Sequence, residues 1–544
     1  MLSKASSPQR IALLQLGRPA PGCNNIVDGL LRFAEQRENV KLFGFINGLK
    51  GMLNDQVVEM TRESFGPYNN LGGQDYLGRS EDVLRTPGHH EAAIAAAKKY
   101  DFDGIVIVGA THTMTDVSVL AEKFLENGVK TRLIHIPATV DGNIHHKYIE
   151  TSLGYDTASK VYSQLIGNML TDSASAIKYW YFIRLMGAEP THLAMECALK
   201  TQPNIVLVSE ECASRNETLT DIVNKIADVC EKRAADGNNY GCVLIPEGLL
   251  SFVSAFKHLI SEFNQIFREG VTSQDEQQKL AHKMYESDEF IKGKLTPWSY
   301  SLYQTLPDFM KLQLLTEREL EGSVKLSHIE TEKLVAYLVD EELKKRKAAG
   351  TYKAAFAPVT HFFGYQGRCG HPSLFDCSLG STYGFAAGVL LENGLNAVTV
   401  TINSVNLAPS EWRVGGVPIL SLLKSQPKSG FPSTQLVVNS EMVDLEGKPY
   451  QHLKSVQRSW ISVDQYKNPG PIQFYLKDQQ HEVPMVINQL YNTTTNISEE
   501  IRGLCASIQN DALFTEHQHL LYAALSSLKS AKQVINSMSN QMTD

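Results

Sequence analysis

The sequence predicts an α/β protein with two doubly wound, Rossmann-like parallel-sheet domains that face a cleft. Short apolar runs alternate with helical patterns, glycine-rich turns follow several of the runs, and the same alternation begins again near residue 180. A helical insertion and a C-terminal extension complete the architecture. The expected boundaries are 1–160 for the first domain, 161–251 with 349–395 for the second, 252–348 for the insertion, 396–475 for a return to the first domain and 476–544 for the extension.

Length, charge and cysteine usage argue against several classes of protein. A chain of 544 residues is too long for one hydrophobic core. A net charge of -8 and a pI near 6.1 argue against nucleic acid or an anionic membrane as a partner. The eight cysteines form no Cys-x-x-Cys pair, which argues against a zinc site or a disulfide framework. No apolar run approaches the ~18 residues that a membrane span requires, and we expect a cytoplasmic protein.

The strands and turns follow one another in a regular order. Apolar runs predict buried strands over 11–16, 40–45, 104–108, 133–136, 181–186, 205–208, 242–245, 355–363 and 397–402. The first strand leads into a turn with Gly17 and Arg18, and then into a helical pattern from Ile26. Such a turn offers backbone N–H groups to a phosphate, although an ordinary strand–helix connection explains it equally well. A turn over 109–115 and a helix that ends at Gly128 follow the third strand.

The loop after the strand at 133–136 carries a candidate catalytic acid. Pro137 ends the strand because it has no N–H to donate, and Gly142 allows the backbone to bend directly after Asp141. In open α/β sheets, ligands bind outside the carboxyl ends of the strands, where this loop lies. Asp141 is therefore a candidate catalytic residue, with a turn-forming or helix-capping role as the alternative.

A second candidate binding loop follows the strand at 355–363. It contains Tyr365 and Arg368 between glycines, and an arginine binds phosphate oxygens through two parallel hydrogen bonds. An aromatic ring and an arginine in one glycine-framed loop therefore predict a binding site for a sugar phosphate. The paired histidines at 89–90 and 145–146 are expected on the surface rather than at a metal.

The insertion and the C-terminal end have patterns of their own. Amphipathic stretches such as 256–267 and 329–347 predict helices, and the basic run at 344–347 is expected to be a solvated helix end. A terminal helix is predicted through Leu520, Leu521, Leu525 and Leu528.

A series of short motifs occurs in one order along residues 10–475. The motifs are Pro21-Gly22, Thr139-Val140-Asp141-Gly142, Gly154-Tyr155-Asp156-Thr157, Lys178-Tyr179, Arg184-Leu185-Met186-Gly187, His192 to Leu199, Ile245-Pro246-Glu247-Gly248-Leu249, Phe362 to Arg368 and Pro469 to Phe474. Together they resemble the long-form pyrophosphate-dependent phosphofructokinases, which move phosphate between pyrophosphate and fructose 6-phosphate. The resemblance implies the phosphofructokinase fold, a Mg²⁺ cofactor if the chain is active, and sites built across a two-fold subunit interface.

The resemblance also assigns roles in the sugar half of the site. It makes Asp141 the proton acceptor and implies substrate binding by Thr139, Lys178, Tyr179, Met186, Gly187, Glu247, Tyr365 and Arg368. In this assignment Glu247 receives a sugar hydroxyl, and Tyr365 with Arg368 holds the 6-phosphate. Lys178 and Tyr179 would reach the site of a neighbouring subunit. One phosphate clamp is lost, because the arginine expected after Gly187 is Ala188 here.

In the donor half, the sequence departs from the active pattern of the family. The active pattern has two adjacent glycines after the first strand. This chain keeps the first as Gly17 but has Arg18 in place of the second, so a side chain would fill space meant for a phosphate. Two aspartates of the active pattern, a magnesium ligand and a pyrophosphate-specificity residue, are Thr111 and His112. No metal ligand is therefore expected, because Thr111 occupies the magnesium position.

Two further departures affect the loop that carries Asp141. The pyrophosphate-binding lysine is Ala138 and the second acid is Asn143. Phosphoryl transfer depends on metal and cations that stabilise the transferring group. Loss of the magnesium ligand, of the phosphate-binding lysine and of the clamp arginine should each cost about 2–4 kcal/mol of transition-state stabilisation. A retained Asp141 can accept a proton but has no polarised donor to act on.

These departures resemble the regulatory alpha subunit of the plant members of the family. The leading hypothesis is a regulatory, catalytically impaired subunit of glycolysis that binds fructose 6-phosphate or a related sugar bisphosphate. It would form a homo-oligomer, or a hetero-oligomer with a catalytic phosphofructokinase subunit. One alternative is an active pyrophosphate-dependent, or less favourably ATP-dependent, enzyme in which Arg18 and His112 rebuild the donor site. A structural subunit without a ligand is the other alternative.

Overall fold

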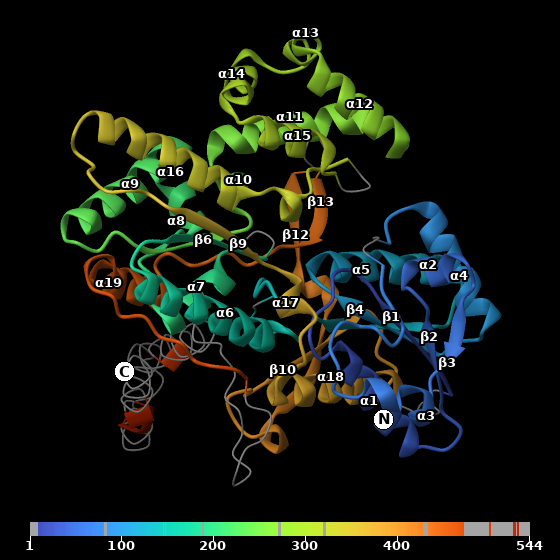
Figure 1. Cartoon of the computed structure of the whole chain (residues 1–544). Coiled ribbons are helices and arrows are strands. Elements are labelled where there is room, and N and C mark those ends of the chain that lie inside the picture. Colours follow the sequence, from blue (N-terminus) through green and yellow to red (C-terminus); the bar gives the residue numbers. More distant parts are fainter. Residues whose placement is uncertain are drawn as a thin grey trace, which may run out of the picture.

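A computed structural model of the chain describes residues 9–80, 84–144, 146, 148–187, 190–269, 274–318, 322–427 and 434–472, together with 500–501, 526–528 and 530–531. Two sheets of mainly parallel strands, each covered by helices, lie side by side, and further helices lie above the second sheet (Figure 1). The predicted fold class is confirmed.

The first sheet has seven strands in the order β11-β10-β5-β4-β1-β2-β3. These strands are β1 (Arg10–Gln15), β2 (Lys41–Phe45), β3 (Val57–Glu59), β4 (Gly104–Gly109), β5 (Arg132–Pro137), β10 (Val398–Asn403) and β11 (Arg413–Pro418). The central strands run parallel, whereas the edge strands β3 and β11 are antiparallel to their neighbours. Gly109 pairs with Pro137, so β4 and β5 end level with each other, just before the loop that carries Asp141.

Helices cover both faces of this sheet. The face with α1 and α18 buries Ile11 and Leu13, and the opposite face, with α4 and α5, buries Ala12 and Leu14, because strand side chains alternate. The helices near this sheet are α1 (Cys23–Glu35), α2 (Leu49–Leu53), α3 (Arg62–Phe65), α4 (Pro87–Lys99), α5 (Thr111–Glu126) and α18 (Leu374–Glu392). α5 begins at Thr111, so the turn predicted over 109–115 is shorter than expected, and Met114 already packs in the core.

The second sheet has four parallel strands in the order β7-β8-β6-β9. They are β6 (Trp180–Leu185), β7 (Ile205–Val206), β8 (Gly241–Pro246) and β9 (Pro358–Phe363). α6 (Tyr155–Ala176) and α7 (His192–Thr201) cover the face with Tyr181 and Ile183. α9 (Leu219–Ala235) and α16 (Thr331–Ala348) cover the face with Trp180 and Phe182.

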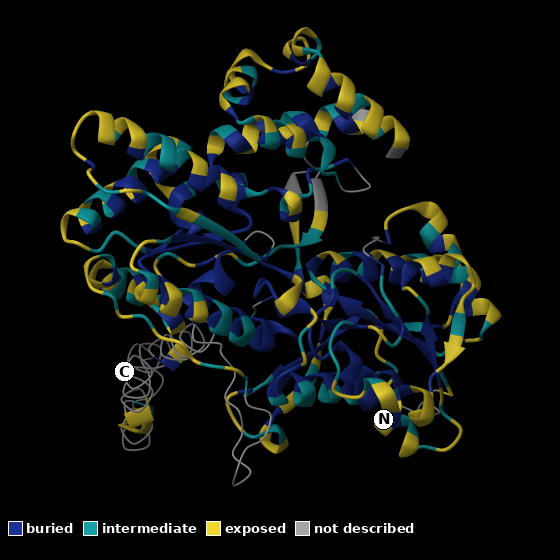
Figure 2. Cartoon of the chain, in the orientation of Figure 1, coloured by how far each residue is buried: buried dark blue, intermediate teal, exposed yellow. Residues whose placement is uncertain are grey.

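The remaining elements extend from these two sheets. The helical insertion contains α11 (Ser254–Glu269), α12 (Gln274–Glu286), α13 (Asp288–Lys292), α14 (Pro297–Thr305) and α15 (Asp308–Thr316). Its outer surface is largely exposed, whereas the inner faces of its helices are buried (Figure 2). Other helices are α8 (Ser209–Ser214), α10 (Leu249–Phe252), α17 (Tyr365–Arg368) and the longer α19 (Lys448–Ser462), and a 3₁₀ turn spans Leu326–His328. β12 (Leu423–Pro427) and β13 (Thr434–Val438) form a hairpin.

Packing assigns three helices differently from the expected domain boundaries. α16 was expected in the insertion, but it contacts β6, β9 and α9 of the second sheet. α18 was expected in the second domain, but it packs on α1 and β5 of the first. α19 was expected with the first domain, but it contacts α7, α9 and β7. An apolar helix face shows that a helix is buried, but not which sheet it covers.

Two further expectations concern a membrane and the C-terminal end. Within the described ranges one helix, α18, is long and apolar enough to cross a membrane, and it packs against α1 with 56% of its apolar window buried. Of the predicted terminal helix, Leu520, Leu521 and Leu525 lie outside the described residues, as does most of the 476–544 extension.

Candidate functional site

The candidate site lies where strands of both sheets end. Asp141 follows β5 of the first sheet, while Met186 and Gly187 follow β6, Glu247 follows β8, and Arg368 lies on α17 after β9 of the second sheet. Side chains from these loops contact one another across the two halves. The structure therefore brings together residues that are more than 200 positions apart, as the arrangement of parallel strands predicts.

Asp141 and Arg368 form a buried ion pair between the two halves. The Nη2 atom of Arg368 lies 3.0 Å from Oδ1 of Asp141, and the two side chains are only 3% and 8% exposed. Arg368 also donates to the sulfur of Met186 at 2.9 Å and to the carbonyl of Pro19 at 3.4 Å. The proton-acceptor position thus already has a cation beside it.

The backbone around Asp141 is held by local bonds and one left-handed glycine. The Asp141 N–H donates to Oγ1 of Thr139 at 3.2 Å. Gly142 adopts a φ of 69°, and a Cβ atom there would lie 2.7 Å from the ring of Tyr155. Only glycine therefore fits directly after Asp141 without displacing a neighbour.

Glu247 is the second buried acid of the site. Its Oε2 atom accepts the backbone N–H of Gly187 at 3.1 Å, and its Oε1 atom lies 3.6 Å from Nη1 of Arg18. Burial raises the pKa of Glu247, while the guanidinium groups of Arg18, Arg184 and Arg368 oppose that shift. The carboxyl group expected to receive a sugar hydroxyl thus lies in a cationic environment.

Arg18 reaches from the first half of the molecule to the second. Besides Glu247, it contacts Ser327, whose Oγ lies 3.0 Å from Nη2 of Arg18. Ser327 lies in the 3₁₀ turn that precedes α16, and α16 covers one face of the second sheet. The arginine that was expected to occupy the diphosphate space therefore makes these contacts with the sugar half.

The donor-half positions carry no carboxylate. Thr111, Ala138 and Asn143 are buried, His112 is exposed, and Thr111 is the first residue of α5. Asn143 donates from Nδ2 to Oγ of Ser440 at 3.1 Å, and its carbonyl accepts the N–H of Glu441 at 3.0 Å. The segment after β13 thus contacts the position where the active pattern has its second acid.

Comparisons with known proteins identify the family. Residues 10–288 match the family described as phosphofructokinase. The chain belongs to the phosphofructokinase family. It is 38% identical over 472 residues to pyrophosphate–fructose 6-phosphate 1-phosphotransferase subunit beta 1 of Arabidopsis thaliana, covering 86% of this chain and 81% of that protein. It is also 38% identical over 472 residues to the alpha subunit of Solanum tuberosum, covering 86% of this chain and 74% of that protein.

Bacterial relatives and solved structures agree with this assignment. The Porphyromonas gingivalis pyrophosphate–fructose 6-phosphate 1-phosphotransferase is 38% identical over 471 residues, covering 86% of this chain and 84% of that protein. The pyrophosphate-dependent phosphofructokinase of Nitrosospira multiformis shares the fold, with a TM-score of 0.52 at 14% identity over 87% of this chain and 99% of that one. The match to alpha and beta subunits is equally close, so overall identity does not distinguish the two subunit types.

Magnesium is the cofactor that the family resemblance implies, and the donor half of this family member does not fit it. Mg²⁺ binds through carboxylates together with substrate phosphates, whereas Thr111 offers a hydroxyl and Asn143 an amide. Among the residues that the structure describes, no group of three or more His, Cys, Asp or Glu side chains could hold a metal ion.

The other predicted residues lie at different places. Tyr365 is 38% exposed and has the guanidinium group of Arg79 5.6 Å from its ring centre. Lys178 and Tyr179 precede β6, so they lie at the opposite end of that strand from Met186, with the Lys178 ammonium 4.6 Å from the Tyr179 ring. This position takes them away from the site of their own chain. Ala188 lies outside the described residues.

Sequence reasoning missed the residues that support the site from the second half. Arg184 donates from Nε to Oε2 of Glu332 at 2.5 Å and from Nη1 to the carbonyl of Ser327 at 2.9 Å. Arg184 belongs to a recognised motif, but nothing in the local sequence marks Ser327 or Glu332, which lie more than 140 residues away. Burial raises the pKa of Glu332, and Arg184 opposes that shift.

A second missed group is a buried pair of aspartates behind the Asp141 loop. Asp376 accepts the N–H groups of Gly154 and Thr157, each at 2.9 Å, and also the Thr157 hydroxyl. Asp156 accepts the hydroxyl of Ser373 at 2.7 Å. Leu153, next to Gly154, donates to the Pro137 carbonyl and accepts from Thr139. The aspartate pair therefore supports the backbone from which the Asp141 loop extends.

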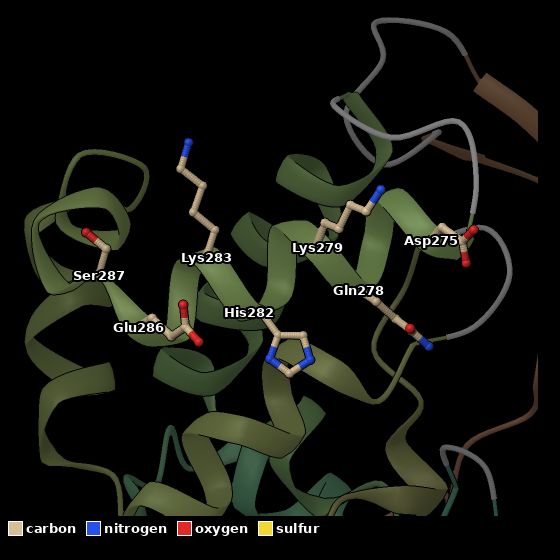
Figure 3. Close-up of a pocket in the computed structure, with 7 residues that line it drawn as sticks. All are labelled: Asp275, Gln278, Lys279, His282, Lys283, Glu286 and Ser287. Atoms are coloured by element: carbon tan, nitrogen blue, oxygen red, sulfur yellow. The ribbon is translucent and has the colours of Figure 1, made fainter.

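A hollow of about 460 Å³ lies on the helical insertion, and the residues that line it are not those of the candidate site. It is formed along α12 by Asp275, Gln278, Lys279, His282, Lys283, Glu286 and Ser287 (Figure 3). Its side chains carry both signs of charge, and none of the predicted site residues lines it.

Proposed function

We propose that this member of the phosphofructokinase family is a regulatory, catalytically impaired subunit that keeps a sugar-phosphate pocket and modulates an active partner. The observation that carries the proposal is the contrast between the two halves of the site. Arg368 of the sugar half pairs with Asp141, and Glu247 lies 3.6 Å from Arg18, whereas Thr111, Ala138 and Asn143 bring no charged side chain to their donor-half positions.

Phosphoryl transfer explains why this contrast matters. The transition state needs cations or a metal on the transferring phosphoryl group and on the leaving group. In the donor half, position 138 holds alanine where the active pattern has lysine, and Arg18 makes its ion pair with Glu247. Pyrophosphate would therefore meet little stabilisation, while a hexose phosphate would still find Glu247, the Gly187 N–H and Arg368 in the other half.

The proposed ligand is fructose 6-phosphate or a related sugar bisphosphate, and the proposed partner is a catalytic subunit of the same family. The location of Lys178 and Tyr179, at the end of β6 opposite to Met186, supports a role at a neighbouring subunit's site. Either a homo-oligomer or a mixed oligomer would use this surface, and we expect the assembly to be cytoplasmic.

The rival proposal is an active pyrophosphate-dependent enzyme with a rebuilt donor site. The position of Arg18 between the two halves is the observation in its favour, because its side chain is 23% exposed and could turn to a phosphate. A subunit without any ligand is the third possibility, and it leaves the close approach of Asp141, Glu247 and Arg368 unexplained.

Assays of the purified chain separate these proposals. The isolated chain should not phosphorylate fructose 6-phosphate with pyrophosphate or ATP in the presence of Mg²⁺, and calorimetry should detect fructose 6-phosphate binding. A catalytic subunit co-purified from the source cells should change its rate or its KM when this chain is added. Robust transfer by the isolated chain would establish the active alternative, and absence of any sugar-phosphate binding would favour the ligand-free subunit.

A further inference from the structure

Arg18 connects the first half of the molecule, built on the seven-stranded sheet, to the second half, built on the four-stranded sheet. Its backbone lies in the turn after β1, and its side chain contacts two buried residues of the second half. Nη2 of Arg18 lies 3.0 Å from Oγ of Ser327, and Nη1 lies 3.6 Å from Oε1 of Glu247. These two contacts form the Arg18 bridge.

Arg368 connects the same two halves in the opposite direction. Its backbone lies on α17 of the second half, and its side chain contacts two residues of the first. Nη2 of Arg368 donates to Oδ1 of Asp141 at 3.0 Å, and Nη1 donates to the carbonyl of Pro19 at 3.4 Å. These two contacts form the Arg368 bridge. Each half therefore sends one guanidinium group to acceptors of the other.

The Arg18 bridge is anchored by further hydrogen bonds inside each half. In the second half, the Ser327 carbonyl accepts from Nη1 of Arg184 at 2.9 Å, so the turn that receives Arg18 is tied to β6. In the first half, the N–H of Gly17 donates to the carbonyl of Ser80 at 2.9 Å. Because both ends are held within their own half, the bridge breaks only if the halves move apart or a side chain turns away.

The two bridges meet in one turn of the backbone. Arg18 starts the first bridge, and Pro19, the next residue, accepts a bond of the second. A movement of this turn relative to the second half lengthens both bridges at once. Both also use a charged donor, and charge-assisted bonds to buried partners are stronger than neutral ones. The geometry therefore couples the opening of one bridge to the opening of the other.

We propose that the Arg18 and Arg368 bridges act together as a latch that keeps the two halves of this chain closed on each other before any ligand binds. In proteins that close around a ligand, contacts with the ligand supply the energy of closure. In this chain, two of its own arginines supply contacts of that kind. The inference goes beyond the proposed function, because it concerns the chain without a ligand and does not depend on what the pocket binds.

Hydrogen–deuterium exchange of the full chain, measured by mass spectrometry without added ligand, tests the proposal. The useful peptides span 139–143, a loop of the Arg368 bridge in which the Thr139 and Asp141 N–H groups donate at 3.1 and 3.2 Å. Arg18→Gln should raise exchange in these peptides at least about tenfold, the size expected for loss of one charge-assisted bond that resists opening. Peptides from β4 and β8 should keep the natural rate, because each half remains folded.

Two further variants make the experiment specific to the bridge. Ser327→Ala removes an acceptor from the opposite half and should raise exchange in 139–143 by a smaller factor, since Glu247 still faces Arg18. Arg32→Gln is the matched control, because this arginine is 61% exposed and pairs with Asp28 within α1. It should leave exchange in 139–143 unchanged.

Three results would overturn the inference. Natural exchange in 139–143 of the Arg18→Gln variant would show that the two bridges open independently. An increase that extends to β4 and β8 would show that Arg18 stabilises the fold of a half rather than the contact between halves. An increase in Arg18→Gln with none in Ser327→Ala would assign the effect to the turn after β1 alone.

Discussion

Asp141 and Arg368 form a 3.0 Å ion pair that joins the two halves of the molecule, and both side chains are buried. Removing one partner of such a pair leaves an uncompensated buried charge. The pair therefore holds the halves together in the absence of ligand, in addition to any role in binding.

The first prediction concerns the stability that this pair provides. Asp141→Asn should lower the free energy of unfolding by about 3–5 kcal/mol, because Arg368 remains buried without its carboxylate. Asp141→Asn combined with Arg368→Met should recover much of the loss, and urea denaturation followed by circular dichroism measures both. Asp101→Asn, which removes an exposed partner of Lys130, should change little. Unchanged unfolding of the Asp141→Asn variant would show that the pair is not structural.

The second prediction restores the donor half. We introduce Thr111→Asp, His112→Asp, Ala138→Lys and Asn143→Asp together. Mg²⁺- and pyrophosphate-dependent phosphorylation of fructose 6-phosphate should rise by at least about a hundredfold, because the carboxylate at position 111 can hold Mg²⁺ and the lysine at 138 places a cation beside the phosphates. The control carries Ala138→Met in place of Ala138→Lys and should remain near the starting rate. A natural chain as active as the restored one would contradict the view that these positions limit catalysis.

The third prediction separates backbone strain from steric fit after Asp141. Gly142 and Gly128 both have a positive φ, 69° and 63°, but a Cβ atom meets the Tyr155 ring at Gly142 and nothing within 4 Å at Gly128. Gly128→Ala should cost about 1–2 kcal/mol from its left-handed backbone alone. Gly142→Ala should cost more and should also weaken fructose 6-phosphate binding, because it displaces the Asp141 loop. Equal effects of the two substitutions in denaturation and calorimetry would show that the close packing at Gly142 is unimportant.

The fourth prediction concerns pH. Burial, with the nearby Asp156 carboxylate, raises the pKa of Asp376 to about 7. An unfolded aspartate has a pKa of about 4, so between about pH 4 and 7 the folded state holds a proton that the unfolded state has released. The stabilising contribution is therefore full below about pH 4 and is lost as the pH rises through about 7.

Denaturation at several pH values tests this sign. Between pH 5 and 7.5, Asp376→Asn should show a smaller decline in stability with pH than the natural chain. It should also be less stable throughout, because an amide cannot accept all the bonds from Gly154 and Thr157. Asp101→Asn, at an exposed position, should keep the natural pH dependence. A pH dependence that persists unchanged in Asp376→Asn would assign it to another group.

The sequence by itself determined the strands β1, β2 and β4 to β10 and the chemistry of the loops that follow several of them, but it did not predict β3, β11, β12 or β13. Pro137 and Gly142 mark the end of β5 and the bend after Asp141, because the limits on proline and glycine backbones act within a few residues. The order of motifs also predicted the family, since each motif is a local pattern. Local chemistry singled out Asp141 and Arg368 as candidates, and only the family resemblance predicted that Glu247 joins them in one site.

Only the tertiary structure decided which charges meet. Arg18 contacts Ser327 and Glu247, Arg184 contacts Glu332, and Asp376 accepts bonds from Gly154, each across a long stretch of chain. The same holds for α18, whose apolar surface predicted burial but not its contact with α1. The physical reason is that local sterics and periodicity select strands and helices, whereas partners of buried charges and apolar faces are fixed only when the whole chain packs.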